Sequence, residues 1–332
     1  MQTIPSQDLT RAADQLHTLR AEIGKAVVGQ HDVLDETIAA LVASGHVLIE
    51  GVPGLGKTLL ARALGKAIDL SYARIQFTPD LMPSDIVGHA VLDPAARGEP
   101  GALAALRVQR GPVFTHLLLA DEINRAPAKT QSALLEVMQE YQVTLEGRSI
   151  ALPLPFMVLA TQNPIETEGT YALPEAQLDR FLLKIDIGYP GAEDETAIVR
   201  RSTEQQAGNL LPLDAVAVCL DGAQVQALQA LAARVHADDK VLDYAVRIVR
   251  ATREWPGLSA GAGPRGAIAL VRVARAAALA QARDFVTPDD VKRHALPALR
   301  HRVQIAPDAQ LEGQRVDELL TGALESVEAP RL

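Results

Sequence analysis

The start of the chain carries two helical patterns of apolar and polar side chains. Over residues 9–23 and again over residues 33–42, apolar side chains recur every three or four positions, with polar and charged residues between them. Residues 27–30 (VVGQ) separate the two patterns and contain a glycine that marks a turn. We therefore predict two amphipathic helices, the second of which ends at Ser44-Gly45.

Beyond this point, short apolar runs alternate with helical patterns. One helical pattern begins at Leu59 and another covers Pro127–Tyr141, and both lie between apolar runs that are too short to be helices. This alternation predicts an α/β fold with a parallel sheet wound by helices on both faces. The predicted strands are His46–Glu50, Ala73–Phe77, His116–Ala120, Met157–Thr161 and Leu182–Gly188.

Two stretches interrupt the alternation. Ile86–Pro112 has glycines and prolines at both ends and a short Ala/Leu-rich helical pattern in its middle. It is too long for a plain turn, so we expect a structured insertion over about residues 86–111. Gln142–Leu152 alternates around Glu146-Gly147, which predicts a β-hairpin. A long loop is expected from Gln162 through Ala176.

The character of the chain changes near residues 189–191. Beyond them the pattern is almost wholly helical, which predicts a second, all-helical domain. Its expected helices are Val225–Val235, Val241–Thr252, Ala267–Ala282 and Val291–Leu299, with a weaker one in the tail. The predicted organisation is an α/β core over residues 1–190, a linker over 191–210 and a helical domain with its tail over 211–332.

Composition limits what this chain of 332 residues can be. With 32 Lys and Arg against 41 Asp and Glu, its formal net charge of −9 argues against a protein held to nucleic acid mainly through phosphates. The single Cys219 excludes an intrachain disulfide and is typical of a reducing compartment. No apolar run is long enough for a bilayer and no secretory signal pattern opens the chain, so we expect a cytoplasmic protein without a membrane span.

The motif with the clearest chemistry is GVPGLGKT, at Gly51–Thr58, between the first predicted strand and the helix that begins at Leu59. It matches G-x-x-x-x-G-K-[ST] in the strand–loop–helix context that gives this motif its meaning. Its glycines allow backbone N–H groups to surround phosphate oxygens, and the positive end of the following helix faces the same anion. We expect Lys57 to reach the β- and γ-phosphates and Thr58 to bind Mg²⁺. The turn at Gly29 lies just upstream, where a nucleoside could rest.

Two adjacent carboxylates follow the third predicted strand. Asp121 lies at the carboxyl end of that strand, beside the phosphate site, where it can hold Mg²⁺ through water. Glu122 can polarise the attacking water in an ATPase, whereas a small-molecule kinase has a substrate hydroxyl to position instead. Asn163, after the next strand, can hydrogen-bond the γ-phosphate and that water, although an Asn before Pro is equally typical of a turn.

Two longer runs carry a family resemblance. LLLADEINRAPAKTQSALLEVMQEYQVTLEG and VLATQNPIETEGTYALPEAQLDRFLLKI are similar to the MoxR family of AAA+ ATPases, and the likeness covers about residues 27–190. The fold that this implies is an AAA+ P-loop core with a parallel wound sheet, followed by a small all-α lid. The resemblance assigns Lys57 and Thr58 to Walker A, Asp121 and Glu122 to Walker B, and Asn163 to sensor 1.

The resemblance also assigns roles to two arginines. Arg180, in LDRF, matches the arginine finger, although its surroundings alone favour a surface arginine near a strand. Arg265, in GAGPRG, matches sensor 2, in a segment that departs from the family's commoner serine- and alanine-containing form. The residues expected at the nucleotide are Val28, Gly29, Gln30, Gly51, Pro53, Gly54, Leu55, Gly56, Lys57, Thr58, Leu59 and Arg265, with Thr58 and Asp121 at the metal and Glu122, Asn163, Arg180 and Arg265 in catalysis.

The implied function is Mg²⁺-dependent ATP hydrolysis by a ring, a hexamer by family expectation, that remodels or activates a partner protein in a chaperone-like role. The resemblance suggests a partner with a von Willebrand factor A (VWA) domain. It also makes residues 86–111 and 142–152 elements that face the ring's central side. Two alternatives stay open: a DNA-acting AAA+ motor, disfavoured by the net acidity, and a nucleotide-gated scaffold with slow turnover, against which Glu122 argues.

Overall fold

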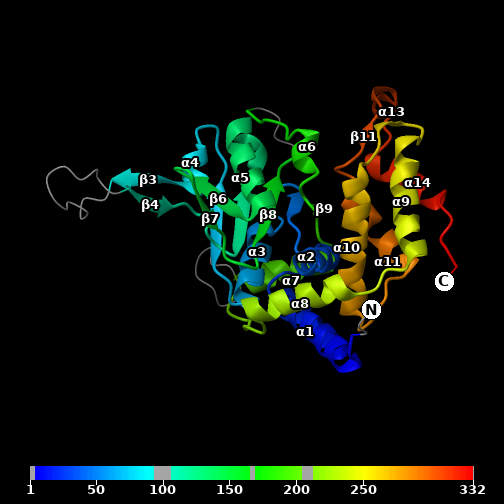
Figure 1. Cartoon of the computed structure of the whole chain (residues 1–332), viewed down its shortest axis with the longest axis horizontal. Coiled ribbons are helices and arrows are strands. Elements are labelled where there is room, and N and C mark those ends of the chain that lie inside the picture. The colour runs from blue at the N-terminus through cyan, green and yellow to red at the C-terminus, as the bar shows by residue number, and fades with distance from the viewer. Residues whose placement is uncertain (1–3, 93–105, 165–168, 204–211, 332) are drawn as a thin grey trace.

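The computed structural model describes residues 4–92, 106–164, 169–203 and 212–331. Figure 1 shows an α/β core with a mainly helical lid beside it. The lid begins after the last strand of the core sheet and runs to the end of the chain. This two-part arrangement agrees with the fold class expected from the sequence.

A five-stranded parallel sheet forms the centre of the core, in the order β2-β5-β8-β1-β9. All five predicted strands form within a few residues of their expected bounds: β1 Val47–Glu50, β2 Tyr72–Gln76, β5 Leu117–Asp121, β8 Met157–Gln162 and β9 Leu183–Asp186. Because the strands are parallel, the residues that follow β1, β5 and β8 meet at one edge of the sheet. That edge brings together the phosphate loop, Asp121-Glu122 and Asn163.

Helices cover both faces of the sheet, and successive strand residues enter different clusters. Val47 and Ile49 of β1 pack with α1, α2 and α3, whereas Leu48 packs on the opposite face with α4 and α5. The core helices are α1 Ser6–Gly24, α2 His31–Val42, α3 Lys57–Ala67, α4 Pro83–Val87, the 3₁₀ helix η1 Ile123–Arg125, α5 Ala128–Glu140 and α6 Glu175–Leu178. α6 falls in a stretch that we expected to be a loop through Ala176.

Two antiparallel hairpins extend from the core. β6 Gln142–Leu145 and β7 Arg148–Ala151 pair around Glu146-Gly147, as predicted, and both turn residues have positive φ. The insertion contains a second pair, β3 Gly88–Leu92 and β4 Leu106–Arg110, which Figure 1 shows projecting away from the lid. The short helix expected in the middle of the insertion falls on residues 93–105, outside the part that the structure describes.

The lid is mainly helical and differs from the sequence prediction in three places. One is a break at His294, which divides the helix expected over Val291–Leu299 into two. The elements of the lid are α7 Ala192–Thr203, α8 Gly222–Arg234, α9 Asp239–Arg253, α10 Pro264–Ala280, α11 Pro288–Arg293, α12 Ala295–Leu299, α13 Pro307–Leu311 and α14 Val316–Glu325, with the strands β10 Leu258–Ala260 and β11 Gln304–Ile305. The expected linker, 191–210, therefore contains the helix α7. The expected all-helical domain contains the short antiparallel pair β10–β11, which is too brief to produce an apolar period.

Across the described ranges, no helix of the chain has both the length and the apolar character needed to cross a membrane.

Candidate functional site

The phosphate loop lies between β1 and α3, as its sequence predicts. Gly54 and Gly56 have φ of 88° and 84°, in the left-handed region that glycine adopts without steric cost. Gly51 passes so close to β9 that a Cβ atom would lie 2.6 Å from the Ile187 backbone oxygen. α3 begins at Lys57, so the positive end of its dipole and its free N–H groups face the loop. The loop therefore has the conformation and polarity of an anion site.

Lys57 lies at the phosphate loop, on the same edge of the sheet as the carboxylates at the end of β5. Its Nζ donates to the backbone oxygen of Gly51 at 2.5 Å. Burial lowers the pKa of Lys57, while the charges of Asp121, Glu122 and Glu50 act in the opposite direction. The phosphate loop and the end of β5 thus share one edge of the parallel sheet, with β8 between their strands. The flanking Leu55 and Leu59 pack against the hydrophobic core, while Pro53 is exposed and Thr58 is partly buried.

Asp121 ends β5 with both carboxylate oxygens engaged. The Thr161 hydroxyl donates to Oδ1 at 2.5 Å, and the Arg74 guanidinium donates to Oδ2 at 2.7 Å. Arg74 comes from β2 and Thr161 from β8, the two strands that flank β5. Sequence reasoning missed both residues. The only signal for them is their position near the carboxyl ends of predicted strands, which becomes informative once the strand order is known.

Glu122 is held in an uncommon backbone conformation. Its φ and ψ are 56° and 50°, in the left-handed region that costs energy for a residue with a Cβ atom. The backbone N–H of Glu122 donates a hydrogen bond to the Thr161 hydroxyl at 2.9 Å. The Glu122 side chain accepts from Gln76 Nε2 at 2.8 Å and lies 3.1 Å from Arg125. One strained residue is thus fixed by three neighbours, of which the sequence predicted none.

Two further predicted segments lie around the same edge of the sheet. Asn163 is buried and follows β8, whose last residue, Gln162, accepts from the Gly51 N–H at 3.3 Å. Asn163 therefore lies beside the start of the phosphate loop. Upstream, Val28–Gln30 forms a turn in which Gly29 has a φ of 72°. The Gln30 side chain ties this turn to the Gly188 oxygen, just after β9, at 2.8 Å.

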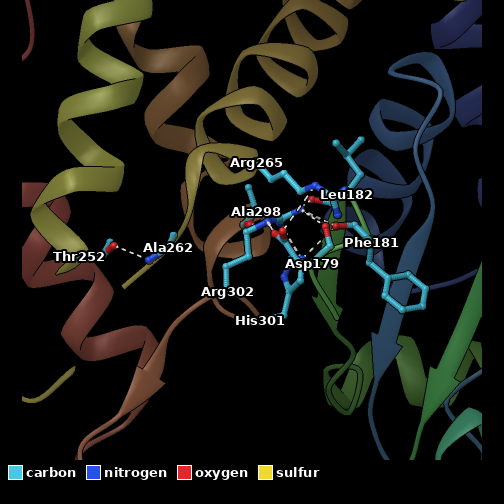
Figure 2. Close-up of polar contacts among 9 residues, drawn as sticks. All are labelled: Asp179, Phe181, Leu182, Thr252, Ala262, Arg265, Ala298, His301 and Arg302. Carbon is cyan, nitrogen blue, oxygen red and sulfur yellow. Dashed lines mark hydrogen bonds and ion pairs between the residues drawn. The ribbon is translucent and has the colours of Figure 1, made fainter. Parts of the chain in front are cut away.

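Arg265 and the segment that carries Arg180 meet on the β9 side of the core. Arg180 is partly exposed and follows α6, immediately before β9. Arg265 stands in the first turn of α10, and its Nε lies 3.7 Å from Asp179, the neighbour of Arg180. Figure 2 shows Arg265 of the lid directed at Asp179 of the core. The structure thus brings Arg265 to the segment that carries Arg180.

Comparison with known proteins identifies two domains. A family described as "ATPase family associated with various cellular activities (AAA)" matches residues 46–183, and the AAA lid domain matches residues 250–322. The first match covers the sheet from before β1 into β9, with the phosphate loop and Asp121-Glu122. The second covers the lid from the end of α9 into α14, and it includes Arg265.

Relatives extend the similarity to almost the whole chain. An uncharacterised protein, YeaC, from Bacillus subtilis is 41% identical over 96% of this chain and 97% of its own length. Chaperone MoxR1 from Mycobacterium tuberculosis is 40% identical over 96% of this chain and 84% of its own. A crystal structure of a candidate ATPase from Cytophaga hutchinsonii superposes with a TM-score of 0.87 at 37% identity, covering 98% of both chains. The chain therefore belongs to the MoxR family of AAA+ ATPases, and it is an ATP hydrolase.

Proposed function

We propose that this ATPase cleaves the γ-phosphate of ATP with Glu122 as the general base. A water attacks the γ-phosphorus, Glu122 accepts its proton, and the bond to the β-phosphate oxygen breaks to leave ADP. Lys57 and the N–H groups of the phosphate loop bind the phosphates, and Asn163 orients the attacking water. The observation that carries this proposal is that the phosphate loop, Asp121-Glu122 and Asn163 lie at the carboxyl ends of β1, β5 and β8, at one edge of the parallel sheet.

The donor set of the site suits Mg²⁺. The Thr58 hydroxyl and the Asp121 carboxylate supply hard oxygen ligands, which Mg²⁺ prefers and commonly supplements with water. Mg²⁺ bound there would neutralise charge that develops during phosphoryl transfer. The carboxylate of Asp121 is oriented by Thr161 and Arg74, so the side chain that would hold the ion is fixed in place.

We further propose that Arg180 acts on the nucleotide of a neighbouring subunit in a hexameric ring. Arg180 is partly exposed and precedes β9, the border strand of the sheet farthest from β2. A guanidinium supplied by a neighbour couples hydrolysis to assembly. The proposed role of Arg265 is that of sensor 2, which reports the state of the nucleotide to the lid.

The proposed task of the ring is chaperone-like remodelling of a partner protein. The name of the relative Chaperone MoxR1 supports this class of function. The hairpins β3–β4 and β6–β7 extend from the core and are the proposed contacts with the partner, for which a VWA-domain protein is the specific candidate. The cytoplasm is the proposed compartment, because the chain has a single cysteine.

The assignment of Glu122 is tested by Glu122→Gln. The amide fits the same space but accepts no proton, so we expect ATP affinity within about threefold of wild type and a fall in kcat of about 10²–10⁴-fold. Calorimetry measures the affinity and a steady-state phosphate-release assay measures turnover. Glu325→Gln, at the exposed end of α14, is the matched control and should leave both unchanged. Near-wild-type turnover of Glu122→Gln would move the base elsewhere.

A further inference from the structure

The main chain on both sides of Arg180 is held by one buried side chain of the lid. Arg302, which follows α12 and is only 3% exposed, reaches across to the core. Its Nε donates to the Asp179 carboxylate at 2.8 Å, and its NH2 and NH1 groups donate to the backbone oxygens of Phe181 and Leu182 at 2.6 and 3.2 Å. Figure 2 shows these bonds converging on the turn that contains residue 180.

A second lid residue supports the same turn. His301 is buried, and burial lowers its pKa well below the usual value. Its Nε2 lies 3.1 Å from the Phe181 oxygen and 2.7 Å from Nη1 of Arg302. The imidazole of His301 is therefore packed between Arg302 and the carbonyl group that follows Arg180.

Asp179 joins both lid arginines to the core. It accepts from Arg302 on Oδ1 and faces Arg265 through Oδ2. The start of α10, which carries Arg265, is itself braced: the Thr252 hydroxyl accepts from the Ala262 N–H at 2.9 Å, as Figure 2 also shows. The position of the Arg265 helix and the position of Arg180 are thus connected through a single carboxylate.

Directed bonds add to the apolar contact between lid and core at this place. Leu182 of the core belongs to the same hydrophobic cluster as Ala298 and Leu299 of the lid. A cavity of about 630 Å³ lies next to this contact, and its lining includes Asp179, Arg302, Lys184, Gly263 and Gln304. The hydrogen bonds of Arg302 have fixed donors and acceptors, so they orient the Arg180 turn relative to the lid.

We propose that Arg302 is a positioning residue for the ATPase reaction, which fixes the Arg180 turn from the lid so that Arg180 reaches the nucleotide of the neighbouring subunit. This inference rests on the proposed trans role of Arg180. A misplacement of about 1 Å at a reacting centre can cost about 10²-fold in rate. Arginine suits the position because its planar fork serves several acceptors at once, whereas lysine offers one compact charge.

The first test is Arg302→Lys, which keeps the charge beside Asp179 and loses the fork. We expect kcat to fall about 10–100-fold with the KM for ATP within about threefold, because the phosphate loop of the same subunit is untouched. The matched control is Arg272→Lys: Arg272 of α10 also donates from the lid to core carbonyls, at Ala43 and Ser44, away from Arg180. It should keep kcat within about twofold of wild type.

Mixed rings separate a positioning role from a general loss of structure. An Arg302→Lys subunit has an intact phosphate loop and Glu122 for its own site, but it offers a misplaced Arg180 to the neighbouring site. A Glu122→Gln subunit offers an intact Arg180 to its neighbour, but its own site is defective. Equal mixtures with random exchange contain about one complete site in four, so activity should rise towards a quarter of wild type. Mixing Arg302→Lys with Arg180→Ala should give no rise, because both impair the arginine that is offered to the neighbouring site. Energy transfer between donor-labelled and acceptor-labelled subunits after mixing shows that subunits exchange.

Asp179→Asn is a milder variant that separates a defect in positioning Arg180 from a defect in folding. It retains an oxygen that can accept from Arg302 and removes the charge, so we expect a smaller loss of kcat, about 3–10-fold, with the same complementation pattern. If Arg180→Ala is inactive, two results would overturn the positioning role and leave the finger assignment in place. One is wild-type turnover of Arg302→Lys, and the other is a loss of turnover that mixing with Glu122→Gln does not restore. Wild-type turnover of Arg180→Ala overturns the finger assignment, and the positioning role with it.

Discussion

The lid meets the core at two junctions that differ in their polar contacts. At the apolar junction, α8 and α10 pack against α1 and α2, and residues of all four helices belong to one hydrophobic cluster. At the polar junction, α12 and the residues after it face β9 and the turn before it. Leu299 and Ile185 extend the same cluster to this junction, where charged side chains also join the two parts. There Arg300 binds Asp186 of β9 and Asp317 of α14, both at 2.9 Å, and Arg302 binds the Arg180 turn.

The difference suggests that the apolar junction holds lid and core together, whereas the polar junction transmits movement between them. Apolar contact is proportional to buried area and has little directional preference, so the apolar junction joins lid and core whatever the nucleotide state. Ion pairs and hydrogen bonds depend steeply on geometry and contribute less net stability. The polar junction is therefore suited to transmit small movements to Arg180 without separating the domains.

The largest effect is expected at the apolar junction. Leu270 of α10 is fully buried in the shared cluster, and Leu270→Ala should lower the free energy of unfolding by about 3–5 kcal/mol, because the cavity left behind is only partly filled. Core and lid should still unfold together. Urea denaturation at fixed protein concentration measures the loss, and Leu311→Ala, at a lid position that is 87% exposed, should change it by less than about 0.5 kcal/mol.

Two outcomes would count against a shared core. A loss below about 1 kcal/mol would mean that Leu270 is not part of a tightly packed cluster. Separate unfolding transitions of core and lid would mean that the apolar junction joins two independent units.

The sheet and the long helices could be predicted from sequence because their apolar patterns extend over several turns or fill a strand. The runs before Gly51 and Asp121 are buried on both faces, and this leaves a signal that survives without knowledge of the fold. α6 and the pair β10–β11 are only a few residues long, so no period can develop. Their conformation depends on tertiary partners: the N–H of Ala306, which follows β11, bonds the Gly257 oxygen just before β10.

The residues of the candidate site likewise fall into a part that could be predicted from sequence and a part that could not. The phosphate loop and Asp121-Glu122 are contiguous and could be located by motif. Arg74, Gln76 and Thr161 act across the strand order β2-β5-β8, which the sequence does not reveal. Arg302 lies more than a hundred residues from the turn that it holds, as a lone arginine without a motif. Contacts that are long-range and polar are therefore the part that required the structure.

A second, smaller effect concerns the charge balance at the polar junction. Glu36 of α2 faces Arg300, Asp186, Asp32 and Asp35, and burial raises its pKa to about 7. Between pH 4.5, the usual pKa, and about pH 7, Glu36 is therefore protonated in the folded protein and ionised in the unfolded chain. The contribution of Glu36 to stability therefore falls as pH rises through this window, and its cost is complete above pH 7.

Glu36→Gln removes this cost, since the amide is neutral at every pH. The stability of the variant relative to wild type should rise by about 2–3 kcal/mol between pH 5 and pH 8. Urea unfolding at pH 5, 6.5 and 8 measures the difference, in which the titrations common to both proteins cancel. Glu325→Gln should show no such slope. A flat difference for Glu36→Gln would place this carboxyl in water rather than in the polar junction.

The smallest effect is the one that distinguishes the two junctions most directly. Asp317 of α14 forms a bidentate pair with Arg300, at 2.9 and 3.2 Å, and its side chain is 31% exposed. Asp317→Asn should lower stability by about 0.5–1 kcal/mol at 0.1 M sodium chloride, because Arg300 keeps Asp186 as a partner. At 1 M the screening length falls from about 10 to about 3 Å, so at least half of that loss should disappear.

The loss caused by Leu270→Ala should change little over the same range, and urea must be the denaturant, since guanidinium is itself a salt. A loss at Asp317 that persists in 1 M salt would show that the polar junction is held by desolvated contacts, and the contrast between the junctions would then lie in geometry alone.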